Sequence, residues 1–91
     1  MLYLIAYDIA SNRRLRRVAR ICEDFGIRVE KSVFECNLSL VQFQELWDRL
    51  SRNVDNEEDK VIAYPIGLIA KEKISALGAV VHNEPKLTYV F

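Results

Sequence analysis

The sequence predicts a two-layer α+β sandwich in which two helices cover one face of a sheet. Two uninterrupted apolar runs, residues 1–7 and 61–64, are typical of buried strands. Two amphipathic segments, residues 12–25 and 39–50, carry apolar side chains at helical spacing. The elements alternate as strand, helix, strand, helix and strand, an order that places both helices on the same side of the sheet.

The composition is that of one globular domain. Of the 91 residues, 51% are hydrophobic and 29% are charged, with only three glycines and two prolines, which disfavours disorder. No apolar run approaches the ~20 residues of a membrane span, and the N-terminus lacks the features of a signal peptide. We therefore expect a single domain over residues 1–91, located in the cytoplasm without a membrane partner. Cys22 and Cys36 occupy apolar positions without CxxC spacing, so we expect buried free thiols.

Charge is unevenly distributed along the chain, although the formal total is zero. Residues 1–34 carry a net charge of +3 and residues 35–91 a net charge of −3. A neutral total alone argues against a nucleic-acid-binding protein. The uneven distribution, however, permits a basic face on a neutral molecule, so nucleic acid is a candidate partner.

The first strand ends in an acid and leads into a basic helix. Residues 1–7 are apolar, and Asp8 follows them, which predicts a carboxylate at the rim of the sheet. Five arginines follow within twelve residues, namely Arg13, Arg14, Arg16, Arg17 and Arg20. An acid beside arginines is typical of a site that holds a metal ion next to a phosphate backbone.

The first helix is expected to be capped by Ser11 or Asn12, to run to about Phe25, and to stop at Gly26, a usual C-terminal signal. Its apolar face consists of Leu15, Val18, Ala19, Cys22 and Phe25, and its opposite face of Arg13, Arg16, Arg17 and Arg20. A basic face is ordinarily a solvated surface. Arginines in a first turn, however, oppose the helix dipole at a cost of a few tenths to ~1 kcal/mol each. An anion at that end would offset this cost.

The middle of the chain is a strand-like segment followed by a second helix. Across residues 28–38 the apolar positions change parity near Lys31 and Ser32, which predicts either a bulge or a tight corner. Ser39, with Gln42 three residues later, predicts a capping box for the second helix. The expected buried stripe of this helix is Leu40, Phe43, Leu46, Trp47 and Leu50.

The segments that follow are an acidic run, a strand and a short helix. Residues 55–59 lack the alternating ligands and central glycine of a calcium loop, so we expect a solvated turn. The strand from residue 61 is expected to end at Pro65, which cannot donate a hydrogen bond to a neighbouring strand. A short helix is expected from about residue 70 to residue 77.

The C-terminal region and the apolar strands together predict a homodimer. Residues 79–82 and 86–91 have the pattern of two strands, and His82, without a partner at ligand spacing, is expected to be structural. The first strand and residues 61–64 are apolar at both parities, whereas two helices cover only one face of the sheet. A second copy is the simplest cover for the other face, so we expect a homodimer packed through its sheets. Region 79–91 is expected to pair at that interface.

Several motifs occur along the chain in a characteristic order and spacing. They are Tyr7-Asp8-Ile9, the arginine-rich helix after it, Gly26 with Arg28-Val29, Lys31-Ser-Val-Phe-Glu35 and Tyr64-Pro65. These motifs resemble those of the CRISPR-associated protein 2 family, the small subunit of the CRISPR adaptation machinery. The resemblance covers nearly the whole chain and is strongest in residues 1–38.

The resemblance implies a ferredoxin-like fold of βαββαβ order with an additional C-terminal strand, a homodimer, and a site at the dimer axis. It implies that Asp8 is the acid of a catalytic metal site, with Mg²⁺ or Mn²⁺ as the cofactor. The catalytic companions of Asp8 would be Tyr7, Arg14, Arg17 (or Arg16), Arg28, Ser32 and Phe34. The nucleic-acid contacts would be Arg13, Arg14, Arg16, Arg17, Arg20 and Arg28. The chain departs from many relatives at residues 10–12, where they carry acidic residues.

Three functions are compatible with these sequence features. In the first, two copies of Asp8 hold a magnesium ion, and the dimer is a CRISPR adaptation endonuclease that cleaves single-stranded RNA or duplex DNA. In the second, the basic faces clamp duplex DNA through its phosphates while the CRISPR-associated protein 1 integrase performs the chemistry. The third, a small-molecule regulatory dimer, gives no account of the arginine stripe. The sequence leaves open the substrate and the distance between the two carboxylates.

Overall fold

The computed structural model describes residues 1–79. Within this part of the chain the elements are β1 (Leu2–Asp8), α1 (Asn12–Phe25), β2 (Ile27–Glu30), β3 (Val33–Asn37), α2 (Leu40–Ser51), β4 (Lys60–Ile66) and α3 (Leu68–Lys71). Apart from Ala79, which is not in a strand, the expected strands 79–82 and 86–91, their pairing and His82 lie outside the described residues.

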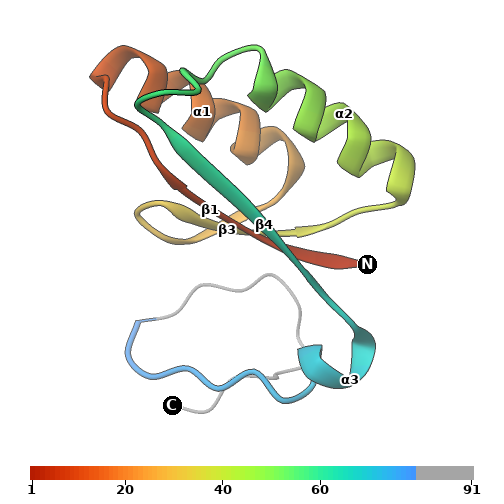
Figure 1. Ribbon diagram of the computed structural model, residues 1–91. Helices are drawn as coiled ribbons and strands as arrows, with labels where there is room; N and C mark the ends of the chain where they lie inside the picture. The colour runs from red at the N-terminus through yellow and green to blue at the C-terminus, as the bar shows by residue number, and fades with distance from the viewer. Residues whose placement is uncertain (80–91) are drawn as a thin grey trace.

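The four strands form one antiparallel sheet in the order β2-β3-β1-β4. Helices α1 and α2 lie side by side against one face of this sheet (Figure 1). The two layers and the βαββαβ order confirm the predicted α+β sandwich, in the ferredoxin-like arrangement. Strand β1 lies between β3 and β4, and its residues Ile5 and Tyr7 belong to the core beneath the helices, whereas the alternate positions face away from the helices.

The segment 28–38 is a hairpin that contains both features considered for its change of parity. Strand β2 ends at Glu30, and Lys31 and Ser32 form the turn into β3. The register between the two strands also shifts between Arg28 and Glu30, which marks a β-bulge. The turn and the bulge are therefore both present. The sequence pattern shows only their combined effect, a shift in which alternate positions of the segment are apolar.

Both long helices begin with the side-chain caps that the sequence predicts. At α1, Ser11 Oγ accepts a hydrogen bond from the Arg14 N–H (3.3 Å). At α2, Ser39 Oγ accepts from the Gln42 N–H (3.1 Å), and Gln42 Oε1 accepts from the Ser39 N–H (2.9 Å). Each cap satisfies backbone donors that have no partner within the helix, which fixes where the helix starts.

Gly26 ends α1 as predicted, but for a different physical reason. Its φ of −168° is an extended conformation that any residue adopts. A Cβ atom at this position would lie 2.2 Å from the carbonyl oxygen of Glu35 and 2.5 Å from Cys36 Sγ. Glycine is therefore required because the end of α1 passes directly against β3, with no space for a side chain.

The hydrophobic core lies between the sheet and the two long helices. Its fully buried members are Ile5, Val18, Cys22, Phe34, Cys36, Leu46 and Leu50. Both cysteines are free and buried, as predicted. Burial raises the pKa of the Cys22 thiol to about 12 and that of the Cys36 thiol to about 11, so both are neutral at physiological pH.

The buried stripe of α2 is narrower than predicted. Phe43, Leu46 and Leu50 pack against the core. Leu40, however, is 66% exposed and Trp47 is 37% exposed, so their expected burial is wrong in the first case and partial in the second. At 3.6 residues per turn, Leu40 and Trp47 both lie on the same side of the three buried residues. This side of the helix turns away from the sheet.

The chain after α2 differs from the expectation at two points. Pro65 lies inside β4 rather than ending it, which is tolerated because β4 is at the edge of the described sheet. The short helix expected at 70–77 is α3, which begins after Gly67 and ends at Lys71. None of its residues is buried, so no apolar face holds further residues in a helix.

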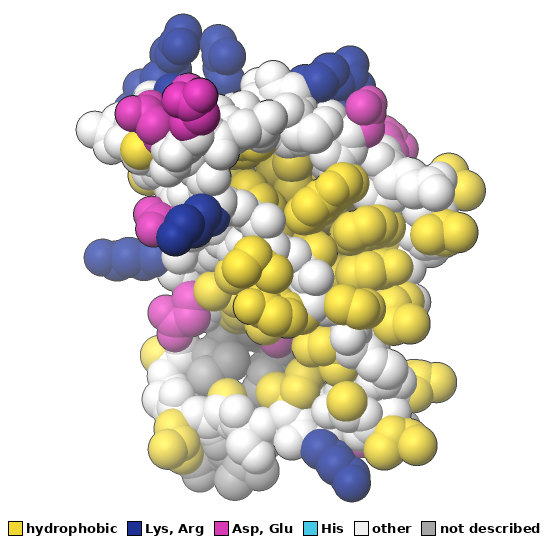
Figure 2. Space-filling view, viewed as in Figure 1, with side chains coloured by type: hydrophobic (Ala, Val, Ile, Leu, Met, Phe, Trp, Pro, Cys, Tyr) yellow, Lys and Arg dark blue, Asp and Glu magenta, His cyan; other side chains and the backbone are white. Residues whose placement is uncertain are grey.

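The sheet face away from the helices carries apolar side chains with substantial exposure. On β4, Ile62 is 47% exposed and Tyr64 is 49% exposed. Figure 2 shows hydrophobic side chains that extend from α2 on the helix side across β4, the edge strand of the described sheet. Among residues 1–79, no helix has the length and apolar character needed to cross a bilayer.

Candidate active site and nucleic-acid interface

Asp8 lies at the rim of the sheet, as predicted, where β1 ends. It is exposed, whereas Tyr7 before it is buried in the core beneath the helices. Because side chains alternate along a strand, Asp8 lies on the opposite face of the sheet from the helices. Its partner in the register with β4 is Lys60, which places a cationic residue beside it.

Tyr7 and Phe34 belong to the core beside Asp8. Their rings stack with centroids 6.2 Å apart, and both side chains are buried. The Tyr7 hydroxyl donates to the carbonyl of Lys31 (3.4 Å), and the Tyr7 N–H donates to the carbonyl of Ser32 (3.0 Å). Burial raises the pKa of Tyr7 above its ordinary value. These contacts fix the 31–32 turn next to the end of β1.

Arg28 belongs to the same group of residues. Its guanidinium lies over the ring of Phe34, 5.2 Å from the centroid. Its Nη1 donates to the carbonyl of Lys31 at 3.2 Å. The structure therefore brings Tyr7, Arg28, Ser32 and Phe34 together around the turn, with Arg28 as the exposed cation of the group.

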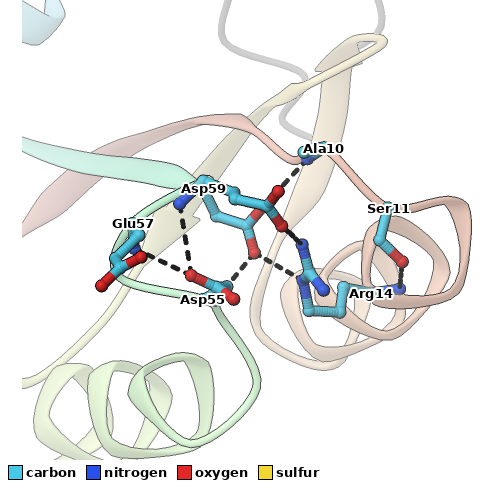
Figure 3. Close-up of polar contacts among 7 residues, drawn as sticks. Ala10, Ser11, Arg14, Asp55, Glu57 and Asp59 are labelled. Atoms are coloured by element: carbon cyan, nitrogen blue, oxygen red, sulfur yellow. Dashed lines mark hydrogen bonds and ion pairs between the residues drawn. The ribbon is translucent and has the colours of Figure 1, made fainter.

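Arg14 points into a polar network rather than outward. Its Nε donates to Asp59 Oδ2 (2.7 Å), and its Nη2 donates to Asp59 Oδ1 (3.2 Å) and to Glu58 (3.2 Å). Asp59 also accepts from the Ala10 N–H (2.9 Å) and the Asp55 N–H (2.8 Å). Figure 3 shows Asp59 between these three parts of the chain. The Arg14 hydrogen bonds hold the pKa of Asp59 well below its usual range.

The acidic run 55–59 is the expected solvated turn at residues 56–58, which are exposed, but the expectation is wrong for its last residue, Asp59. The Asp59 side chain is 0% exposed, and its carboxylate is paired with Arg14. The run looked solvated because five polar residues in a row give no apolar periodicity. The informative signal is topological: once β4 is paired antiparallel with β1, the start of β4 lies opposite the end of β1.

Asp59 also changes the argument about the basic first turn of α1. The first turn contains no acidic residue, and its arginines were expected to favour an external anion. Asp59 supplies a carboxylate at that end from within the chain, bonded to the Ala10 N–H just before the helix. The helix start therefore needs no bound phosphate.

The remaining arginines of α1 form an exposed basic surface. They are Arg13, Arg16, Arg17 and Arg20, all exposed and without an ion pair to another residue of the described range 1–79. Lys and Arg side chains project beyond the helical layer at the top of Figure 2. Exposed cations of this kind are suited to contact phosphates.

Asp8, the candidate metal ligand, does not belong to a cluster of potential ligands in the described part of the chain. Residues 1–79 contain no group of three or more His, Cys, Asp or Glu side chains able to hold a metal ion. A carboxylate oxygen is the donor that Mg²⁺ and Mn²⁺ prefer, so the residue type fits. Magnesium is held by one or two carboxylates together with waters and substrate phosphates, and a second copy would supply a second Asp8.

The chain matches the family described as CRISPR associated protein Cas2 over residues 1–74. The chain belongs to the Cas2 family. The CRISPR-associated endoribonuclease Cas2 1 of Moorella thermoacetica is 42% identical over 83 residues, covering 86% of each chain. The CRISPR-associated endonuclease Cas2 of Halalkalibacterium halodurans is 38% identical over 84 residues, covering 87% of this chain and 88% of the relative.

A solved structure of the family is similar to this one in fold. The crystal structure of Streptococcus pyogenes Cas2 at pH 6.5 superposes with a TM-score of 0.77 at 34% identity, covering 86% of this chain and 100% of that one. The matched residues 1–74 include every candidate site residue named above. The resemblance seen in the sequence motifs is therefore confirmed.

Proposed function

We propose that the protein acts in CRISPR adaptation as a nucleic-acid-binding homodimer and a metal-dependent endonuclease. Its substrate would be a phosphodiester of single-stranded RNA or duplex DNA. The names of the Moorella and Halalkalibacterium relatives, endoribonuclease and endonuclease, support this activity. The observation that carries the proposal is an exposed Asp8 at the sheet rim, directly before a helix with four exposed arginines.

The dimer is part of this proposal because Asp8 and the exposed apolar side chains share one sheet face. In the register of β1 with β4, Ala6 pairs with Ile62 and Leu4 with Tyr64, two and four positions before Asp8. Positions two apart lie on the same face of a strand. A copy packed on this face would therefore bring a second Asp8 toward the first.

Asp8 of each subunit would hold Mg²⁺ or Mn²⁺. When bound, the ion would supply a water of lowered pKa and polarise the scissile phosphate. Arg17 and Arg28, both exposed, would position the nucleic-acid backbone through its phosphates. We assign Tyr7, Ser32 and Phe34 to holding the turn beside Asp8, since their contacts lie within the protein.

The test of this proposal is cleavage of end-labelled single-stranded RNA and duplex DNA with Mg²⁺, Mn²⁺ or EDTA. We expect cleavage only with a divalent ion, and a loss of about 100-fold or more in Asp8→Asn, because a transition-state charge would lose its stabilisation. Light scattering should show an intact dimer. The matched control Glu45→Gln, at an exposed carboxylate of α2, should cleave like wild type. Cleavage that persists in Asp8→Asn would contradict the metal site.

A second candidate function is architectural, and the exposed arginines of α1 favour it. In this function the dimer clamps duplex DNA through phosphates for the CRISPR-associated protein 1 integrase, without cleavage. It predicts binding whose log-log salt slope becomes shallower by nearly one for each of Arg16→Ala and Arg17→Ala. Wild-type protein that binds duplex in this way and cleaves nothing would favour this function over the nuclease.

A further inference from the structure

The loop between β1 and α1 is short, and Asp59 holds its middle. Only Ile9, Ala10 and Ser11 separate Asp8 from the first residue of α1. The Ala10 N–H is bound by the Asp59 carboxylate at 2.9 Å, while Ser11 caps the helix. A carboxylate at the start of β4 therefore fixes the course of the chain directly after Asp8.

Asp59 directly precedes β4, the strand that pairs with the strand of Asp8. The following residue, Lys60, is the partner of Asp8 in the register of β4 with β1. On its other side, the Asp55 N–H donates to Asp59 at 2.8 Å (Figure 3). Asp59 thus directly precedes β4, which is hydrogen-bonded to the strand of Asp8, so the two carboxylates lie at the same end of the sheet, a rigid base for a functional site.

Arg14 connects the same carboxylate to α1. Two of its nitrogen atoms bind the two oxygens of Asp59, a bidentate contact that fixes direction as well as distance. The first turn of α1 is thereby fixed to the start of β4. Arg13, Arg16 and Arg17 project from the same turns, so the contact also sets where these exposed cations stand relative to Asp8.

We infer that Asp59 and Arg14 are positioning residues for the site of Asp8. Neither would touch nucleic acid or metal; they would hold the Asp8 carboxylate and the α1 arginines in one arrangement. This inference rests on the proposed nuclease function and adds to it the residues that order the site. The alternative is a purely structural role, in which the pair affects only the stability of the fold.

The test compares Asp59→Asn and Arg14→Lys in the full-length protein with the matched control Asp24→Asn. Asn keeps the shape of Asp but loses the charge facing Arg14, and Lys keeps the charge but not the bidentate contact. Asp24→Asn breaks another Asp–Arg pair, with Arg49 (3.0 Å), at the opposite end of α1. All measurements are made at a temperature at which circular dichroism shows each variant to be folded.

Three quantities are measured: amide hydrogen exchange of residues 8–14, Mn²⁺ binding without nucleic acid by electron paramagnetic resonance, and kcat and KM for cleavage. We expect Asp59→Asn to accelerate the exchange and to weaken Mn²⁺ binding about 10-fold. We expect kcat to fall about 100-fold with little change in KM, because the exposed arginines still bind the substrate. Arg14→Lys should show smaller changes of the same direction, and Asp24→Asn none.

Unchanged exchange and Mn²⁺ binding in Asp59→Asn would overturn the inference. A loss of activity that follows only the fraction of unfolded protein would also overturn it, since that is the result of a purely structural role. A wild-type protein that neither cleaves nor binds Mn²⁺ would reject the proposed function instead. In that case the exchange measurement alone decides whether Asp59 holds the loop.

Discussion

At the scale of single residues, Asp59 shows what a buried carboxylate needs in a domain of this size. A buried charge is costly unless it is paired and hydrogen-bonded. Asp59 has the guanidinium of Arg14 and backbone N–H donors from Ala10 and Asp55. Across residues 1–79, no buried side-chain nitrogen or oxygen lacks a hydrogen-bond partner. The buried side-chain polar atoms at this end of the sheet therefore all have hydrogen-bond partners.

The ionisation of Asp59 makes folding stability depend on pH in acid. Hydrogen bonds from Arg14, and then from the Asp55 and Ala10 N–H groups, hold the pKa of Asp59 below its usual range. The unfolded value is about 3.9. Because the folded pKa is lower, the ionised group stabilises the fold fully above about pH 4, and this contribution is lost as pH falls through the folded pKa. We expect Asp59→Asn to lower the urea midpoint at pH 7 and to make it less sensitive to pH between about 4 and 2.

The control for this prediction is Glu58→Gln. Glu58 also bonds Arg14, but its side chain is 61% exposed, so solvent screens the pair. Urea midpoints should therefore follow the wild-type pH dependence in this variant. An equally steep decline below pH 4 in Asp59→Asn and wild type would show that other carboxylates cause the acid sensitivity.

The sequence predicted the place of Asp8 but not the role of Asp59, and the physical reason is the range of the interactions. Asp8 follows an apolar run, which is a local pattern. Asp59 is defined by a contact with Arg14, 45 positions away in the chain. A carboxylate in a polar run gives no local sign that a distant guanidinium will bury it, so only the pairing of β4 with β1 shows it.

At the scale of elements, the junction between α1 and β3 depends on the absence of a side chain at Gly26. We expect Gly26→Ala to destabilise the fold by about 1–3 kcal/mol, because the new Cβ would force α1 away from the Glu35 carbonyl and Cys36 Sγ. Urea denaturation measures this free energy. Gly67→Ser is the matched control, since a Cβ at Gly67 meets no atom within 4 Å and Ser is a favourable helix cap. Equal stability of Gly26→Ala and wild type would mean that the junction adjusts freely.

The sequence predicted well those helices whose start is marked by residues of the chain itself. Both long helices have an apolar stripe and a Ser cap, at Ser11 and Ser39, and both begin where expected. The short helix α3 was misplaced because it has no buried residue, so its limits follow from Gly67 and local hydrogen bonds alone. Leu40 was misassigned for a related reason: periodicity gives the direction of a buried stripe, but the shape of the facing sheet sets its width.

At the scale of the whole molecule, the exposed arginines of α1 and the Asp8 carboxylate lie on two different surfaces. The exposed arginines lie on α1, in the helical layer, whereas Asp8 lies on the sheet face away from the helices. One chain therefore offers an exposed cationic surface and, on the other side, the single candidate carboxylate Asp8. The sequence could predict both surfaces, but not how two copies would be placed in the proposed dimer, because the relative placement of two chains leaves no periodic signal in one.

The proposed dimer is tested most directly by a charge on the exposed sheet face. Tyr64 is 49% exposed on β4, and Tyr64→Glu would place a carboxylate in the expected interface, where desolvation is unfavourable. We expect this variant to be monomeric by analytical ultracentrifugation, to keep its helical circular dichroism, and to lose cleavage, because a lone Asp8 supplies one ligand. Val41→Glu is the matched control: Val41 is an exposed apolar residue of α2, so its charge should leave both dimer and cleavage intact. A Tyr64→Glu protein that stays dimeric would place the interface elsewhere, and one that cleaves as a monomer would show that a single Asp8 is sufficient.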